Sequence, residues 1–249
     1  MLRIVGDVGF GDSFFDIGFG IGSMVDTGVN PLEHILSESK DLWLGNLECV
    51  ISDTSIKTGV KAECFRLPID TFSNLSHLNV YAVANNHLMD HGAVAYNNTL
   101  SAVNYAAKHV GSNKKRSILV EHNEIVYGIM AFSSRKDENT KDPLYWYRPE
   151  YTEILKEYAE ISSADFKIIY MHWGNEFINY PNVDQKFLAH WLIDIGFDLV
   201  VGCHSHVMQG YEVYKDKHIF YSLGNFLFNM TTPETRHSAI VNVDFIDNK

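Results

Sequence analysis

The chain has 249 residues, of which 31 are acidic and 20 are lysine or arginine, giving a formal net charge of −11 at pH 7. A surface that binds nucleic-acid phosphates needs clustered lysine and arginine, so this balance excludes a general nucleic-acid-binding protein. Hydrophobic residues make up 46%, which is typical of a globular protein with a sizeable core. An anionic substrate would need a local source of positive charge, which bound divalent cations supply.

Cysteine use and hydropathy predict a cytoplasmic protein. Cys49, Cys64 and Cys203 form an odd number in a chain too large to need disulfides, which favours reduced thiols. The amino-terminus lacks the basic and apolar regions of a signal peptide, and no apolar run approaches membrane-spanning length. We therefore expect no membrane segment in this chain.

Predicted strands and helices alternate along the chain. The first strand, 2 to 7, leads into a glycine-rich loop, and a helix is predicted to open with Asn30 as its cap and Pro31 at its first position. Further apolar runs predict strands at 41 to 46, 80 to 85, 125 to 132, 166 to 173 and 197 to 203, and helices at about 91 to 110, 149 to 160 and 184 to 195.

Two more strands are predicted within 218 to 228 and 238 to 246, with no long helix between them. The polar stretch 133 to 142 predicts a surface loop. This order favours an α/β protein with mixed sheets, helices outside them and a single domain over residues 1 to 249.

Polar and metal-ligating side chains gather at the carboxyl ends of the predicted strands. They are Asp7, Asn46, Glu48, Asn85, Asn86, His87, Asp90, His172, His204 and His206. Ligands bind to open α/β sheets beyond the carboxyl ends of the strands, so these side chains could converge on one crevice.

The histidines carry the strongest signal for metal. In extended geometry His204 and His206 would leave the same face of the chain, a spacing typical of metal ligands. An isolated pair of this kind more often makes ordinary hydrogen bonds in a loop, and a lone His172 would more often be a core histidine. The companions at other strand ends favour the metal site.

The segment 85 to 90 has two interpretations. Asn85 is equally consistent with a helix cap and with the site, whereas Asn86 and His87 favour the site. Asp90 could meet His87 if a helical turn starts there.

The acidic residues narrow the choice of metal. Asp7 and Glu48 add hard anionic oxygens, and a mixed oxygen and imidazole set suits Mn²⁺, Fe or Zn²⁺ better than a structural zinc cage, which would use cysteine. Cys203 and Cys49 are interpreted as small buried spacers. The spread of ligands along the chain favours catalysis over local stabilisation.

The motifs GDVGFGD, GNLE, NNHLMDHG, HWGNEF, GCHSHVMQGYE and YSLGNFLF follow in this order from Asp7 to about Phe228. As a set they closely resemble the CapA family of capsule and poly-γ-glutamate synthesis proteins, a branch of the calcineurin-like metallophosphatases. The resemblance implies a four-layer αββα sandwich, two mixed sheets flanked by helices, with a binuclear metal centre at the strand ends.

The resemblance also implies roles for individual residues. Asp7 and His206 would bind the first ion, Glu48 would bridge, and the second ion would be held by Asn86, His172 and His204. His87 would face the leaving oxygen, oriented by Asp90. The implied substrate-binding residues are Arg66, Asn46, Trp173, Glu176, Gln209 and Asn225, although for Arg66 a plain surface arginine is the alternative.

Two departures from the superfamily concern the first ion. The histidine that usually stands two residues after the first aspartate is replaced by Gly9, and the usual bridging aspartate by Asn46, with Glu48 nearby. CapA-type sequences share both changes, which support the family and weaken the first metal position.

The resemblance predicts a metal-dependent phosphoesterase-like hydrolase of capsule or cell-envelope polymer synthesis. A hydroxide bridging two divalent ions would attack phosphorus in line, and His87 would protonate the departing alkoxide. One alternative is a non-hydrolytic synthesis component that binds an anionic, carboxylate-bearing polymer, and another is a metal-free fold with structural histidines. Many relatives carry an amino-terminal membrane anchor, so a lost anchor is the alternative to the cytoplasmic prediction.

Overall fold

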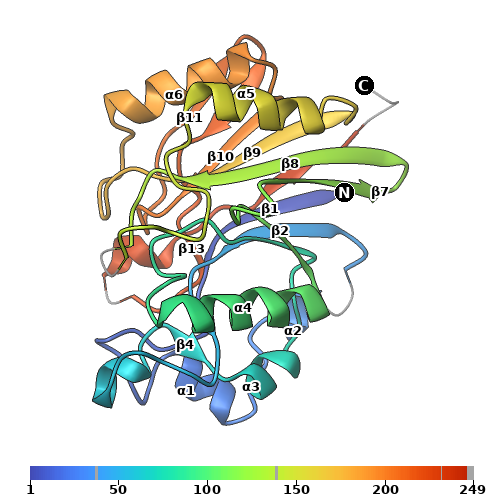
Figure 1. The fold of residues 1–249 in the computed structure, drawn as a ribbon. Helices are drawn as coiled ribbons and strands as arrows, with labels where there is room; N and C mark the ends of the chain where they lie inside the picture. Colours follow the sequence, from blue (N-terminus) through green and yellow to red (C-terminus); the bar gives the residue numbers. More distant parts are fainter. Residues whose placement is uncertain (37–38, 138–139, 231, 246–249) are drawn as a thin grey trace.

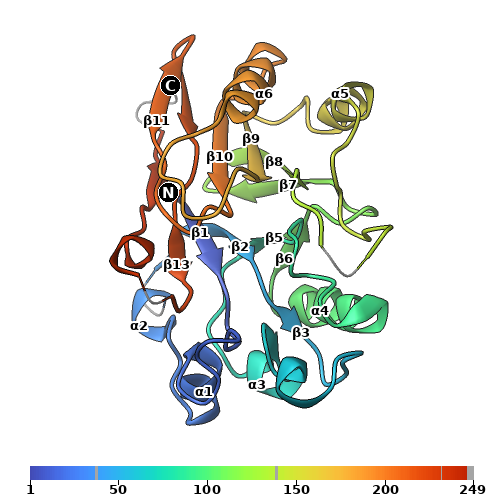
Figure 2. The same ribbon diagram turned by 90° about the vertical axis from the view of Figure 1, so that its left-hand side faces the viewer.

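The computed structural model describes residues 1–36, 39–137, 140–230 and 232–245. They form four layers, with two stacked sheets between two layers of helices (Figure 1). The view turned by 90° shows the same stacking along the strands (Figure 2). The predicted α/β sandwich with two mixed sheets is therefore confirmed.

The first sheet has the strand order β13-β1-β2-β5-β6, and β14 pairs with β1. Its members are β1 (Leu2–Val8), β2 (Leu42–Leu47), β5 (Val80–Ala82), β6 (Lys108–Val110), β13 (Asn225–Leu227) and β14 (Val241–Val243). All neighbours run parallel except β14, which is antiparallel to β1. Parallel pairing brings the carboxyl ends of β1, β2 and β5 to one edge.

The second sheet has the order β11-β12-β10-β9-β8-β7. Its members are β7 (Ser117–His122), β8 (Ile125–Ser133), β9 (Phe166–His172), β10 (Leu199–Cys203), β11 (Tyr211–Tyr214) and β12 (Lys217–Phe220). The central strands β8, β9, β10 and β12 are parallel, and β7 and β11 are antiparallel edge strands. A small parallel pair joins β3 (Val50–Ile51) to β4 (Arg66–Leu67).

Helices cover the outer face of each sheet (Figure 1). The first sheet is covered by α1 (Ile21–Asp26), α2 (Glu33–Leu36), α3 (Ile69–Ser73) and α4 (Gly92–Ala106), and the second by α5 (Tyr151–Glu160) and α6 (Val183–Asp194). Short 3-10 turns lie at Gly59–Ala62 and Pro233–Arg236. Among the described residues, no helix has both the length and the hydropathy needed to cross a bilayer.

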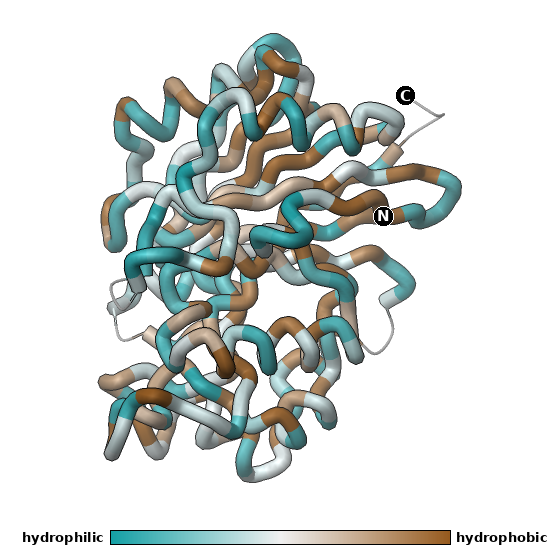
Figure 3. Tube along the Cα trace, viewed as in Figure 1, coloured by the Kyte–Doolittle hydropathy of each residue, from teal (hydrophilic) through white to brown (hydrophobic). Residues whose placement is uncertain are grey.

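The central strands are buried on both faces, which explains their nearly continuous apolar sequence. In β9, Ile168 and Tyr170 pack between the two sheets, while Ile169 and Met171 pack toward α5 and α6. The apolar segments accordingly run through the middle of the molecule (Figure 3). The Tyr170 hydroxyl donates to the Val5 carbonyl at 2.6 Å and joins the sheets directly.

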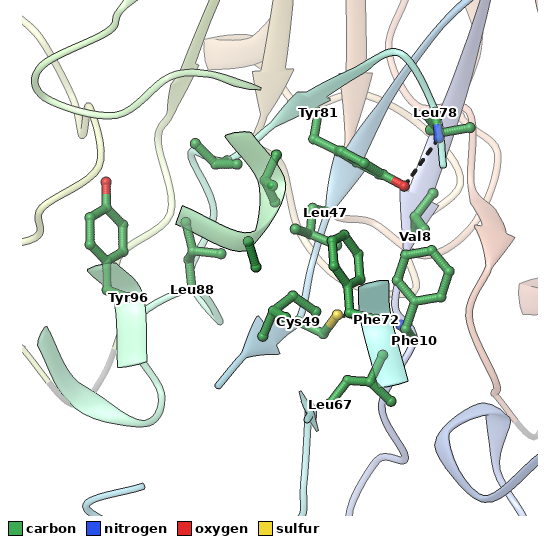
Figure 4. Packing of buried hydrophobic residues seen from close by; sticks show 14 of the residues in the cluster. Val8, Phe10, Leu47, Cys49, Leu67, Phe72, Leu78, Tyr81, Leu88 and Tyr96 are labelled. Carbon is green, nitrogen blue, oxygen red and sulfur yellow. Dashed lines mark hydrogen bonds between the residues drawn. The ribbon is translucent and has the colours of Figure 1, made fainter. Parts of the chain in front are cut away.

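A third apolar cluster holds the helices against the outer face of the first sheet (Figure 4). Phe10 and Phe72 meet edge to face with ring centroids 5.7 Å apart, and the Tyr81 hydroxyl accepts a hydrogen bond from the Leu78 amide at 3.2 Å. Both phenylalanines are fully buried, so replacing Phe72 with alanine should cost about 3–5 kcal/mol. This packing anchors the loop that follows β1.

Two sequence predictions differ from the structure near the helix ends. The helix predicted from Pro31 begins only at Glu33, because the Asn30 side chain exchanges hydrogen bonds with Ser76 and does not cap it. The helix predicted to 110 ends at Ala106, since residues 108–110 pair with β5 as strand β6.

The stretch 133 to 142 is not a simple surface loop, because Ser133 and Asp137 are fully buried; residues 138–139 lie outside the described residues. Of the strand predicted at 238 to 246, only 241–243 forms β14, and residue 246 lies outside the described part. The prediction for 218 to 228 resolves into the end of β12 and all of β13.

Candidate metal centre

The first sheet brings two carboxylates and an amide together. Asp7 in β1 lies in register with Asn46 in β2, and Glu48 follows directly after β2; all three are fully buried. The Asn46 amide donates to Asp7 Oδ1 at 2.9 Å and to Glu48 Oε2 at 3.3 Å. Asn46 therefore separates and orients the two carboxylates.

The second sheet supplies three buried histidines. His172 ends β9, in register with Cys203 at the end of β10, and its ring centroid lies 4.5 Å from that of His204. His204 and His206 have φ angles of 91° and 56°, so the predicted extended geometry is wrong. The backbone turns because the His204 amide donates to Asp7 Oδ2 at 3.1 Å, and such left-handed residues often mark functional sites.

Among the described residues, four overlapping sets of three possible ligand atoms result, one of them formed by Asp7, His172 and Cys203, and two of the four share Glu48. The first group is Asp7, Glu48 and His206, and the second is Glu48, His172 and His204. Within each group the ligand atoms lie within 4.8 Å of one another. Asn86 joins the second group, because its Oδ1 lies 2.6 Å from His172 Nε2. The structure thus brings together all six predicted ligand residues, whose metal-binding roles stay predictions.

Several buried polar atoms of these groups lack an internal partner. Within the described ranges, Glu48 Oε1 and both ring nitrogens of His204 make no hydrogen bond. Leaving a buried polar group unsatisfied costs about 1–3 kcal/mol, so such atoms need an explanation. A divalent cation would satisfy Glu48 Oε1 and one ring nitrogen of His204, and carboxylate with imidazole is a donor set that Mn²⁺, Fe or Zn²⁺ accepts.

The electrostatics of the groups fit the same interpretation. Burial, reinforced by the charge of Asp7, raises the pKa of Glu48 well above its usual range. Burial lowers the pKa of His172 well below its usual value, and burial with the neighbouring His206 lowers the pKa of His204 to about 2. The imidazoles are therefore neutral, which is the form that binds metal.

His87 and Asp90 form the predicted pair beside the second group. His87 Nδ1 lies 3.0 Å from Asp90 Oδ2, inside the turn that precedes α4, and the ring stacks on Phe65 at 4.3 Å. Burial lowers the pKa of His87, but the hydrogen bond and charge of Asp90 more than offset it and leave the pKa raised. Lys57 Nζ lies 3.4 Å from the same Asp90 oxygen.

Asn85 serves as a brace for this turn. Its amide donates to Asn46 Oδ1 at 3.1 Å and to the Leu47 carbonyl at 2.6 Å, and its Oδ1 accepts from the His87 amide at 3.2 Å. The last contact is a local cap of the turn, and the first joins the turn to the carboxylate pair. The helix-cap interpretation is wrong, because α4 begins at Gly92 with His91 as its N-cap, and the site interpretation stays a prediction.

Two cavities open onto the ligand groups, and His87 and Glu176 line both. The aromatic cavity, of about 340 Å³, touches His206 and is walled mainly by Phe14, Phe15, Phe65, Phe177 and Met230. The basic cavity, of about 240 Å³, touches Asn86 and His204 and is walled by Asp90, Arg135 and Lys136. Each ligand group thus faces a cavity of different chemistry.

Comparison with known proteins now identifies the family. Residues 1–230 match the family described as bacterial capsule synthesis protein PGA_cap. The chain belongs to this family. The match covers the whole of the ligand set and ends within the loop that carries Met230.

Curated relatives of this PGA_cap chain are named for capsule and polymer synthesis. The Bacillus anthracis capsule biosynthesis protein CapA is 32% identical over 68% of this chain and 44% of its own length. The Bacillus subtilis PGA biosynthesis protein CapA is 34% identical over 64% and 44%. A Mycobacterium tuberculosis protein named as a polyglutamine synthesis accessory protein is 31% identical over 74% and 55%. The chain spans about half the length of these relatives.

Solved structures place the fold among the metallophosphatase-like proteins. A Staphylococcus aureus structure described as a 5'-nucleotidase, in complex with α-ketoglutarate, has a TM-score of 0.57 over 88% of this chain and 48% of that one. A novel phosphatase from Mycoplasma pneumoniae has a TM-score of 0.53 over 90% and 71%. Both are 14% identical to this chain, so they show the fold alone.

The glycine at the superfamily's missing histidine is enforced by packing. A Cβ atom at Gly9 would lie 2.8 Å from two carbons of the Phe228 ring, so a side chain there would require this ring to shift. Phe228 also packs on His206, with ring centroids 4.9 Å apart. The first group therefore has an aromatic neighbour, Phe228, beside the position of Gly9.

Two predicted substrate-binding residues lie beside the ligands. Glu176 is exposed, lines both cavities, and forms a further possible ligand group with His204 and His206. Asn225 Oδ1 lies 2.9 Å from His206 Nδ1, and its amide donates to the carbonyls of His206 and Thr235. Asn225 therefore orients a predicted ligand and has no polar atom left for a substrate.

Three predicted substrate-binding residues lie away from the two cavities. Arg66 donates to the Ala62 and Ser52 carbonyls and to Glu63. Trp173 is buried against α6 and donates to the Tyr221 carbonyl at 2.8 Å, and Gln209 donates to the Ile178 carbonyl at 2.8 Å. These internal contacts use the polar atoms that a substrate would need, so their positions do not support the predicted role.

The sequence interpretation missed the residues that wall the cavities. Arg135 and Lys136 lie just beyond β8, and the rule that located the other strand-end residues would have found them. Phe65 and Phe177 have φ angles of 52° and 61° and come from loops, for which no periodic pattern was available.

Proposed function

We propose that this PGA_cap chain is a metal-dependent phosphoester hydrolase that acts in capsule or cell-envelope polymer synthesis. The observation that carries the proposal is the position of Glu48, whose carboxylate belongs to both ligand groups. One carboxylate between two sets of donors is the arrangement needed to hold two cations close together.

Different residues of the chain would bind each of the two cations. Asp7, Glu48 and His206 would hold one cation, while Asn86, His172 and His204, with Glu48, would hold the other. Bound divalent ions would lower the pKa of a coordinated water and neutralise charge on phosphoryl oxygens. The imidazoles of His172 and His204 are already neutral, so no proton has to leave these two rings on binding.

His87 is the proposed proton donor to the leaving oxygen. Asp90 holds Nδ1 at 3.0 Å, so Nε2 is the nitrogen for proton transfer, and the stack on Phe65 fixes the ring plane. The raised pKa keeps the protonated form present near neutral pH. Asp90 acts through His87 and is a positioning residue.

The test is to count metal and measure hydrolysis on the same sample. Protein loaded with Mn²⁺ should contain two equivalents and hydrolyse p-nitrophenyl phosphate or bis-p-nitrophenyl phosphate, and His87→Ala should lower turnover by about 10²–10⁴-fold with metal content unchanged. A loaded protein that is inert toward both esters, with no effect of His87→Ala, would contradict the proposal.

A second candidate is a non-hydrolytic synthesis component that binds an anionic polymer. It is favoured by the contact of Gly9 with Phe228, because that contact leaves the first group one ligand short of the superfamily pattern. One metal equivalent, with affinity for poly-γ-glutamate and no turnover of either ester, would support this candidate.

A further inference from the structure

Arg135 stands at the basic cavity on a braced segment. Ser133, in register with His172, accepts a hydrogen bond from the Arg135 amide at 3.0 Å and donates to its carbonyl at 2.8 Å. The buried Tyr145 hydroxyl accepts from the Asp137 amide at 2.8 Å and donates to the Arg135 carbonyl at 3.2 Å. The backbone that carries this arginine is therefore fixed on both sides.

The Arg135 side chain lies on the same cavity as the second ligand group. It lines the basic cavity together with His204 and Asn86, and with the proposed proton donor His87. Lys136 adds a second positive charge to the same wall. A ligand in this cavity would therefore touch predicted metal ligands and a guanidinium at once.

The positive charge on this wall is not used by an ion pair in the part of the chain that the structure describes. No carboxylate there lies within 4.0 Å of a nitrogen of Arg135 or Lys136, whereas Arg3 pairs with Asp41 and Arg66 with Glu63. The Arg135 guanidinium is available to an external anion.

We propose that Arg135 binds an oxyanion of the substrate in the basic cavity, with Lys136 as a weaker electrostatic partner. The planar guanidinium offers paired N–H donors that match phosphate and carboxylate oxygens. The ligand class is thus a phosphate or carboxylate group. The proposal rests on the proposed function for the placement of that group beside the second ligand group.

This assignment replaces the sequence prediction for Arg66 with a residue that lines the basic cavity. It also answers an electrostatic difficulty, because Glu176 lines the same cavity and the whole chain is acidic. Two positive side chains on one wall lower the cost of bringing an anion past Glu176. The anion site and the ligand groups would then act on one substrate.

The first experiment measures binding of inorganic phosphate by calorimetry on the metal-loaded chain. Arg135→Gln should weaken phosphate binding at least tenfold, and Arg135→Lys should lie between, because lysine keeps the charge and loses the fork. The matched control is Arg148→Gln, which removes the same charge from a residue that donates to the Ser134 carbonyl and does not line the basic cavity. Metal content should be the same in all four proteins.

A second titration separates the two sources of oxyanion. If Arg135→Gln weakens the binding of a γ-linked tri-glutamate but not of phosphate, the group that Arg135 binds is a carboxylate. If Arg135→Gln weakens the binding of phosphate, the group is a phosphoryl group. Equal affinities of the wild type and Arg135→Gln for both probes would overturn the proposal. Absence of ester hydrolysis with a phosphate affinity that still depends on Arg135 would defeat the proposed function and leave the anion site standing.

Discussion

The two ligand groups share Glu48 and differ in how far the protein itself satisfies them. In the first group, Asp7 accepts hydrogen bonds from Asn46 and from the His204 amide, and His206 is held by Asn225. In the second, both ring nitrogens of His204 lack a partner among the described residues. Among the described residues the first group is thus more fully hydrogen-bonded than the second, and Glu48 Oε1, which belongs to both, has no partner.

This difference predicts that the second group would hold a cation more tightly than the first. Binding a cation there would satisfy a ring nitrogen of His204 that has no partner, although it would also displace the contact of His172 Nε2 with Asn86 Oδ1, whereas in the first group Asp7 and His206 Nδ1 already make hydrogen bonds. The cavities follow the same division, since the basic cavity touches His204 and the aromatic cavity touches His206.

The largest effect is expected at the shared residue. Glu48→Gln should lower metal affinity at both groups, by at least about 100-fold, because it removes the one charge common to them. The same change should raise the melting temperature of the metal-free protein, since burial and Asp7 both disfavour the Glu48 carboxylate. Elemental analysis after dialysis and thermal melts with and without chelator measure the two effects.

The control for this variant is Glu121→Gln, which makes the same change at an exposed position of β7. It should leave the metal content and the chelator effect at wild-type values. If Glu48→Gln kept two metal equivalents, the view that one carboxylate serves both groups would be wrong.

The next effect compares the groups directly. His204→Ala should reduce metal affinity by roughly tenfold more than His206→Ala, because an unsatisfied buried nitrogen costs about 1–3 kcal/mol in the metal-free state. Calorimetric titration of each chelated variant with Mn²⁺ gives the two affinities. A greater loss in His206→Ala would reverse the order of the groups.

A smaller effect is expected from restoring the superfamily's missing ligand. Gly9→His alone should lower stability by about 1–3 kcal/mol, because its Cβ would meet the Phe228 ring. Combined with Phe228→Ala, the histidine has room and should raise the metal affinity of the first group above that of Phe228→Ala alone. Denaturant unfolding and Mn²⁺ titration measure the two steps. If Gly9→His had wild-type stability, the Phe228 ring would be able to move aside at little cost, and the predicted destabilisation would be wrong.

The smallest expected effect concerns the pH dependence of stability at His109, a residue that belongs to neither ligand group. Burial lowers the pKa of His109 to about 4, and Asn104 and Ser112 lie within hydrogen-bonding distance of its ring nitrogens. Its neutral form therefore contributes stability that is present above pH 6.5 and is lost as the pH falls toward 4.

His109→Gln should flatten the decline of the melting temperature between pH 6.5 and 4, and it should do so equally with metal and with chelator. Thermal melts across this window provide the measurement. If metal changed the difference in melting temperature between His109→Gln and the wild type, His109 would be coupled to the ligand groups. That result would contradict the prediction, which rests on the contacts of His109 with Asn104 and Ser112.

Much of the architecture could be predicted because it depends on local patterns. Apolar runs of strand length and their order along the chain were enough to predict α/β layers and mixed sheets, and the predicted strands at 125 to 132 and 166 to 173 correspond closely to β8 and β9. The strand-end rule likewise located the residues of both ligand groups, because parallel strands present their carboxyl ends at one edge. The single-domain count and the cytoplasmic location stay predictions.

The rest depended on which distant segments pack together. Gly9 is constrained by Phe228, the backbone at His204 turns toward Asp7, and Arg66 is occupied where Arg135 is not. Each of these facts comes from contacts between residues far apart in the chain, which no local periodicity encodes. The sequence by itself determined which chemistry-bearing side chains stand at strand ends, and only the tertiary structure decided which of them face a cavity with donors to spare.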